Sequence, residues 1–180
     1  MTLLIFLNTV LSVLVIGGQV FVVLSLVYLV FLRKKYPAIG MLLGKYGMAG
    51  AFFVALASVL GSLFYSQIAG FMPCELCWFQ RIFLYPQVLL LALALIKKDS
   101  GIVDYALSLS LVGGLVSLYH NYMYYYNGGL NVFCQLSGIQ VSCVKRYVFE
   151  FGYITIPMMA LTAFVLIIIF LLFKKYKNNI

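Results

Sequence analysis

Long runs of apolar residues, each bounded by short polar or basic stretches, set the pattern of this chain. They cover about residues 3 to 32, 46 to 66, 78 to 96, 105 to 126 and 151 to 173. A helix that crosses a bilayer needs about 20 predominantly apolar residues, and each run meets that length. The pattern therefore predicts an all-α integral membrane protein whose helices are joined by short connections.

Composition agrees with this interpretation and excludes a soluble fold. Of the 180 residues, 65% are hydrophobic and only 9% are charged, and the mean hydropathy is +1.10. A soluble domain of this length needs more polar residues on its surface. The net charge of +8 does not indicate nucleic acid as a partner, because the basic residues cluster at the ends of the apolar runs and not along one polar face.

The distribution of lysine and arginine predicts the orientation of the helices. Nine of these residues fall on one side of the predicted membrane and three on the other. The positive-inside rule makes the richer side cytoplasmic. The nine are Arg33, Lys34, Lys35, Lys45, Lys97, Lys98, Lys174, Lys175 and Lys177, and the three are Arg81, Lys145 and Arg146. The N-terminus and the loops 67–77 and 127–150 then face outward, and the C-terminus is cytoplasmic.

The first apolar run is predicted to be a retained helix that crosses from outside to inside. A secretory signal carries positive charge before a short apolar core. This run contains no Lys or Arg before Arg33 and is longer than such a core. At about 30 residues it is expected to tilt in the bilayer or to extend beyond it.

A polar stretch with two cysteines lies just before the third run. Cys74 and Cys77 are separated by two residues, a spacing that suits reversible disulfide chemistry. Pro73 favours the start of a helix here. Both thiols would then lie at the helix N-terminus, where the backbone favours a thiolate. Arg81 follows Cys77 by four residues and adds a fixed positive charge on the same face. The stretch predicts a redox site at a membrane edge.

Two further cysteines, Cys134 and Cys143, lie in the loop 127–150 with eight residues between them. All four cysteines are predicted to be extracytoplasmic, where disulfides persist. Four cysteines permit three pairings. The local pairs are Cys74 with Cys77 and Cys134 with Cys143, whereas cross-loop pairs require the two outward loops to touch. A structural disulfide would show the same spacing as a redox pair. A four-cysteine zinc site is disfavoured by the spacing of the second pair and by the compartment, so no metal is predicted.

Two polar residues at the outer ends of helices are further candidates. His120 is the only histidine in the chain and ends the fourth run among tyrosines. It suits an interfacial hydrogen bond, and it equally suits a group that exchanges protons near a redox site. Gln67 ends the second run, where an interfacial position and contact with a ligand are both open. Pro86 in the third run is expected to bend its helix.

Residues 73–82 (PCELCWFQRI), followed by Tyr85 and Pro86, resemble the quinone-linked site of the DsbB family of thiol oxidases, in particular its BdbC-like branch. Residues 151–157 (FGYITIP) resemble the same branch. The resemblance covers about residues 46 to 173. It implies a four-helix transmembrane bundle over residues 46–180, with an extra N-terminal transmembrane helix and a basic cytoplasmic link over residues 1–45.

The resemblance also implies roles for the residues of the CxxC motif. Cys77 would be the thiolate next to a quinone, and Cys74 would be its disulfide partner. Arg81 would polarise a quinone carbonyl, with His120 and Gln67 as further ligands. The quinone would be ubiquinone or menaquinone from the membrane pool.

The loop cysteines would connect this site to a second protein. Cys134 would form the mixed disulfide with a soluble or anchored thioredoxin-fold thiol oxidase, and Cys143 would resolve it. The chain would then be a multi-pass protein of the bacterial cell membrane that supports disulfide formation in exported proteins.

Two alternatives remain beside this interpretation. A reductase of the vitamin K epoxide reductase type also combines a helix bundle, a CxxC motif and loop cysteines. In that family the loop pair precedes the CxxC motif, whereas here it follows. A non-enzymatic membrane protein could instead use its disulfides only to stabilise the outer loops.

Overall fold

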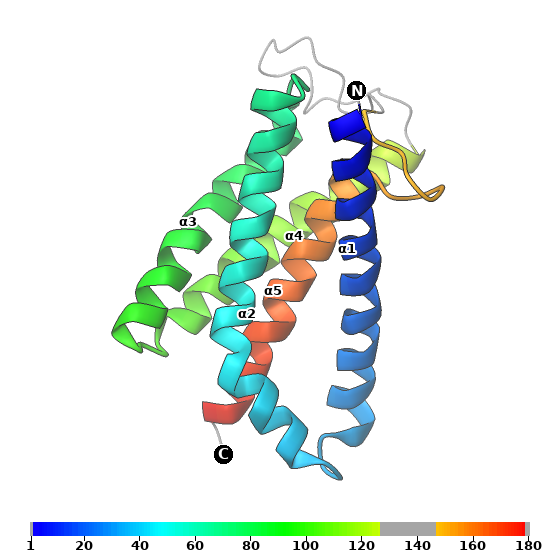
Figure 1. The fold of residues 1–180 in the computed structure, drawn as a ribbon. Helices are drawn as coiled ribbons and strands as arrows, with labels where there is room; N and C mark the ends of the chain where they lie inside the picture. Colours follow the sequence, from blue (N-terminus) through cyan, green and yellow to red (C-terminus); the bar gives the residue numbers. More distant parts are fainter. Residues whose placement is uncertain (1, 127–146, 179–180) are drawn as a thin grey trace.

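The computed structural model describes residues 2–126 and 147–178, and these form a bundle of long helices (Figure 1). The helices are α1 (Thr2–Val27), α2 (Pro37–Leu63), α3 (Glu75–Lys97), α4 (Ile102–Tyr126) and α5 (Ile156–Asn178). A π-helical turn extends α1 (η1, Tyr28–Leu32) and another extends α2 (η2, Phe64–Ile68). Within the described ranges there is no strand, and the only β-type pairing is an isolated bridge between Glu150 and Ile154.

All five helices are long and apolar enough to cross a membrane, so the chain is a multi-pass membrane protein. This confirms the prediction from the apolar runs. Large apolar side chains are exposed on the outer faces of the helices, for example Phe31 at 75% and Ile96 at 78%. Such a surface suits lipid as the surrounding solvent.

Three boundaries differ from the prediction. The basic link was expected to span residues 33–45, but α2 begins at Pro37, because proline is well suited to the first position of a helix. The loop 67–77 is likewise shorter, since η2 runs to Ile68 and α3 begins at Glu75. The fifth helix was expected from residue 151 and begins at Ile156.

A tight turn accounts for the late start of α5. Phe151 and Gly152 have φ angles of 51° and 79°, which a right-handed helix does not allow. The Glu150–Ile154 bridge closes this turn. Thr155 then accepts a hydrogen bond from the backbone N–H of Met158 through its Oγ1 at 3.3 Å, as an N-cap residue does.

We call the end of the bundle with the α1–α2 connection and the C-terminus the basic end, and the end with Cys74 the cysteine end. At the basic end α2 packs closely on α5. A Cβ atom added at Gly44 would collide with the carbonyl of Phe173, and one added at Gly47 with the carbonyl of Phe170. Small residues of this kind let helix backbones approach each other in lipid.

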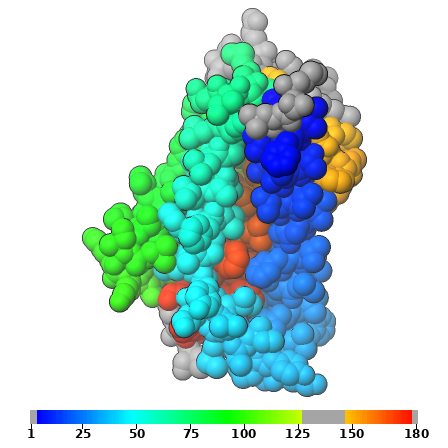
Figure 2. Space-filling view, in the orientation of Figure 1, coloured from blue at the N-terminus to red at the C-terminus, as the bar shows by residue number. Residues whose placement is uncertain are grey.

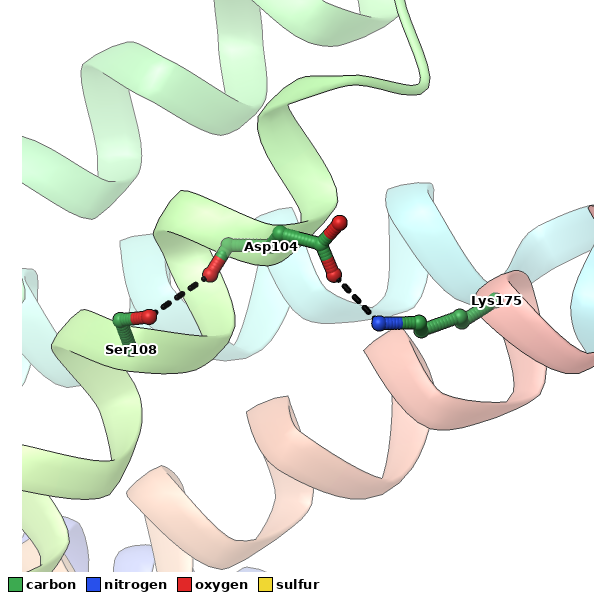
Figure 3. Close-up of polar contacts among 3 residues, drawn as sticks. All are labelled: Asp104, Ser108 and Lys175. Carbon is green, nitrogen blue, oxygen red and sulfur yellow. Dashed lines mark hydrogen bonds and ion pairs between the residues drawn. The ribbon is translucent and has the colours of Figure 1, made fainter.

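An exposed ion pair lies at the same end. Lys175 of α5 donates to Asp104 of α4 at 2.7 Å, while Ser108 bonds the Asp104 carbonyl (Figure 3). Both charged side chains are largely exposed, so the pair contributes little to stability.

Candidate active site

The CxxC motif lies at the start of α3, as the sequence predicts. Cys74 is the N-cap residue, and its carbonyl accepts the first helical hydrogen bond, from the N–H of Trp78 at 3.1 Å. A hydrogen bond of 3.2 Å joins the sulfurs of Cys74 and Cys77. Cys74 is buried and Cys77 is half-buried. The unpaired N–H groups and dipole of the helix N-terminus stabilise a thiolate at this place.

His120 of α4 lies beside Cys74. Its Nε2 is 3.8 Å from the Cys74 sulfur, and its Nδ1 is 3.2 Å from the Nε2 of Gln80. With the Gln80 amide nitrogen donating to it, Nδ1 is the acceptor, so Nε2 carries the hydrogen that faces Cys74. His120 is therefore held as a donor to the sulfur and not as a surface residue, because only 1% of it is exposed.

These contacts change the pKa of the Cys74 thiol. The hydrogen bond with Cys77 lowers the pKa of Cys74, His120 lowers it further, and together they outweigh the opposing effect of burial. The thiolate of the pair is thus favoured on Cys74. The resemblance assigned the thiolate next to the quinone to Cys77, the sulfur nearer in sequence to Arg81.

Arg81 of α3 is a buried cation, only 7% exposed. Its Nε donates to the Ser62 hydroxyl at 2.9 Å and its Nη2 to the Ser62 carbonyl at 3.0 Å. Its guanidinium lies 5.1 Å from the centre of the Trp78 ring. In the described part of the chain the only ion pair is the distant Lys175–Asp104 pair, so no described carboxylate neutralises Arg81. A buried, uncompensated charge is costly to stability and is well placed to bind an acceptor oxygen.

The cysteines and Arg81 line a cavity of about 440 Å³. Gln80 and His120 line it as well, and the remaining wall is mostly apolar. The apolar residues come from α1, α2, α3 and α5, with Leu11, Val54, Ala57, Leu84, Ala160 and Phe164 among them. A cavity of this size, mostly apolar with a few polar groups, suits a small and largely apolar molecule.

Stacked aromatic rings adjoin the cavity at the cysteine end. Phe71 stacks on Tyr65 with ring centres 5.8 Å apart and on Tyr147 at 4.7 Å. All three residues line the cavity. They connect η2, the segment before α3 and the segment before α5, so that aromatic side chains from distant parts of the sequence meet beside Cys74.

The other predicted site residues lie elsewhere. Gln67 is exposed on η2 and does not line the cavity, although its neighbours Tyr65 and Ser66 do. Pro86 lies inside α3 and is not among the lining residues. Cys134 and Cys143, with Lys145 and Arg146, fall outside the described residues.

Gln80 is a site residue that the sequence analysis did not assign. It is only 6% exposed, and its separation of three from Cys77 puts both on one face of the helix. That spacing is the signal that would have found it. The pairing with His120 depends on how α3 packs against α4, which the spacing alone does not give.

Cys74, Cys77 and His120 also form a compact donor set, with their ligand atoms within 4.8 Å of one another. Two sulfurs and an imidazole are ligands that zinc accepts. The described residues add no fourth cysteine, histidine or carboxylate to this group. A closed structural zinc site of four protein ligands is therefore not formed by the described part of the chain.

Comparison with known proteins places the chain among disulfide-forming proteins. A family model described as disulfide bond formation protein DsbB matches residues 44–174. Disulfide bond formation protein C of Bacillus subtilis is 42% identical over 126 residues, which cover 70% of this chain and 90% of that protein. A probable disulfide formation protein C of Halalkalibacterium halodurans is 43% identical over 122 residues, 68% of this chain and 88% of that protein. No solved structure matches the chain.

Proposed function

This chain belongs to the DsbB family of disulfide bond formation proteins, and we propose that it is a membrane thiol:quinone oxidoreductase. In this reaction the Cys74–Cys77 dithiol is oxidised to a disulfide and a membrane quinone, ubiquinone or menaquinone, is reduced to quinol. The observation that carries the proposal is the cavity itself, which is lined both by a hydrogen-bonded dithiol and by a buried Arg81 that has no carboxylate partner among the described residues.

Different residues of the cavity contribute to different parts of a two-electron oxidation. Formation of the Cys74–Cys77 bond releases two electrons and two protons. A bound quinone supplies an acceptor for both electrons and both protons. Arg81 orients and polarises the acceptor oxygen, and the apolar walls exclude water around it. His120 stabilises the Cys74 thiolate and lies where it can relay a proton, while Gln80 fixes its tautomer.

Electrons reach this site from a second cysteine pair and a second protein. A thiolate of a thioredoxin-fold oxidase, soluble or anchored, attacks the Cys134–Cys143 disulfide. The dithiol that results then reduces the Cys74–Cys77 disulfide. Each exchange proceeds toward the more oxidising pair, and about 30 mV corresponds to about 1.4 kcal/mol for two electrons. The cysteines face the outside of the bacterial cell membrane, and the basic end faces the cytoplasm.

The test is a stoichiometric reaction without oxygen. The purified protein is reduced, freed of reductant and mixed with ubiquinone or menaquinone, while thiols are counted by mass-tagged alkylation. We expect loss of four thiols and formation of two quinols per protein, and no quinol from Cys77→Ser. Cys134→Ser combined with Cys143→Ser is the matched control, and it should still lose two thiols.

The two competing functions give different results in the same assay. A protein with structural disulfides leaves the quinone spectrum unchanged with either quinone. A quinone reductase of the vitamin K epoxide reductase type also oxidises its dithiol with a quinone, so the reduced thioredoxin-fold partner is added to the same mixture, and such a reductase forms no disulfide in that partner. Either result overturns the proposal.

A further inference from the structure

The first helix lies outside the region that the family model matches, since that region begins at residue 44. Nevertheless α1 contributes Leu11, Leu14 and Val15 to the cavity that also contains Cys77 and Arg81. The cavity around Cys74 and Cys77 is therefore completed by α1, a helix outside the region that the family model matches.

Polar contacts hold α1 in a defined position. Tyr65 of η2 donates to Asn8 at 2.9 Å, and Asn8 is 7% exposed. Gln19 donates to Thr162 of α5 at 3.2 Å and accepts from Tyr153 at 2.7 Å. Such hydrogen bonds join helices in lipid, where water does not compete for them. These contacts determine which side chains of α1 face the cavity.

The cavity opens sideways between α1 and α2. Leu14 of α1 and Phe53 of α2 both line it, and both are mostly exposed, at 65% and 64%. A Cβ atom added at Gly61 of α2 would meet nothing within 4 Å. On the face shown in Figure 2, atoms of α5 are visible between α1 and α2. The opening thus faces the apolar interior of the membrane and belongs to the same cavity as Cys77 and Arg81.

We propose that α1 is one wall of a groove that binds the isoprenoid chain of the quinone. This inference rests on the proposed function and adds a binding element to it. A cavity of about 440 Å³ holds a ligand of small-molecule size, so a long chain has to leave it. The opening between α1 and α2 is apolar, is continuous with the redox site and faces lipid, which is where such a chain lies. Leu11, Leu14 and Val15 contact the first part of the chain as it leaves.

The test compares two quinones that share one ring, one with a long isoprenoid chain and one without any chain. The variant replaces Leu11, Leu14 and Val15 by alanine. Its matched control replaces Val13, Val20 and Leu24, which are exposed on the same helix and do not line the cavity. We expect KM for the long-chain quinone to rise about tenfold in the first protein and less than twofold in the control. KM for the chainless quinone should stay unchanged in both.

A second variant blocks the groove from the opposite wall. Gly61→Leu should raise KM for the long-chain quinone only, whereas Gly17→Leu, at an open position of α1 that does not line the cavity, should have no effect. Unchanged KM for both quinones in all lining variants overturns the role of α1 and leaves the oxidase intact. Failure of the unaltered protein to reduce either quinone overturns the proposed function itself. Normal reduction of the chainless quinone, with an added dithiol as the electron donor, shows that each variant is folded.

Discussion

At the basic end of the bundle α2 and α5 touch backbone to backbone, whereas at the cysteine end the same two helices stand on opposite sides of a cavity. Gly44 and Gly47 allow the backbone contact at the basic end, because neither has a side chain that would collide with α5. At the other end Ser58 and Ser62 of α2 face the chamber together with Ile156 and Ala160 of α5. The two helices therefore provide stability at one end and a binding site at the other.

Charge is distributed in the same unequal way. At the basic end all the cations except the half-buried Lys174 are exposed, and Lys175 has a carboxylate partner at 2.7 Å. At the cysteine end Arg81 is buried, and within the described residues it donates to the neutral hydroxyl and carbonyl of Ser62. An exposed pair is solvated and nearly neutral in its effect on stability, whereas a buried cation without a carboxylate partner among the described residues is costly to stability. The contrast supports the proposal that Arg81 is the cation that binds the quinone oxygen.

The largest effect is expected from Arg81→Gln. A hydrogen bond to a charged group contributes about 1.5–3 kcal/mol, so kcat/KM for the quinone should fall by about 10- to 100-fold. Lys175→Gln is the control at the basic end and should change it less than twofold. Steady-state reduction of the quinone, with an added dithiol that regenerates the reduced protein, measures both. Equal effects of the two variants would remove the distinction between the ends.

The next prediction concerns packing. Replacing a glycine by alanine should change the free energy of unfolding in opposite directions at the two ends. Gly44→Ala forces a Cβ against the Phe173 carbonyl and should lower the free energy of unfolding in detergent by about 1–3 kcal/mol. Gly61→Ala meets open space and should raise it by up to about 1 kcal/mol, because alanine favours a helix over glycine. A loss of stability in both variants would show that the cysteine end is as closely packed as the basic end.

A smaller effect is expected on the pH dependence of Cys74 alkylation, to which His120 contributes. Because the pKa of Cys74 is lowered in the fold, its thiolate persists as the pH falls below the ordinary thiol pKa of about 8.5. In a Cys77→Ser background, which leaves a hydroxyl donor beside Cys74, its alkylation rate should change little between about pH 8 and pH 6.

His120→Ala in the same background removes one of the groups that lower this pKa. The thiolate should then protonate at higher pH, and the alkylation rate should fall steadily over the same range. Gln80→Leu should give an intermediate profile, because it frees the tautomer of His120 without removing the ring. Identical profiles in the three proteins would contradict the role of His120.

The smallest effect is expected for Asp104→Asn. The Lys175–Asp104 pair is exposed (Figure 3), so its loss should change the free energy of unfolding by less than about 1 kcal/mol. Thermal unfolding in detergent measures this change, and addition of salt should reduce the difference further. A larger loss would mean that the basic end also relies on specific charge contacts.

Much of this fold follows from local sequence. The apolar runs predict the five spans because the bilayer demands a minimum length. Pro73 and the CxxC spacing predict a helix N-terminus at the cysteines. Pro37 starts α2 earlier than the run of apolar residues indicates, and the positive φ angles at Phe151 and Gly152 delay α5. Both boundaries depend on backbone geometry that the hydrophobic pattern does not record.

The site was predictable only in part. Cys74, Cys77 and Arg81 lie within one short stretch, so their spacing on a helix already brings them together. Contact between Cys74 and His120 joins positions 46 residues apart and depends on how α3 packs against α4. The share of α1 in the cavity depends likewise on its packing along α5. Gln67 is at the expected membrane edge, yet its side chain is exposed, because helix rotation and not sequence position decides which side chain enters the cavity.

One measurement tests the central claim most directly, because it depends only on residues of the cavity. The Cys134→Ser and Cys143→Ser protein, reduced and mixed with one equivalent of quinone without oxygen, retains only the Cys74–Cys77 dithiol. The account predicts one quinol and one new disulfide per protein in a single turnover. Neither product should form in Cys77→Ser. Persistence of both thiols while the quinone stays oxidised would contradict it.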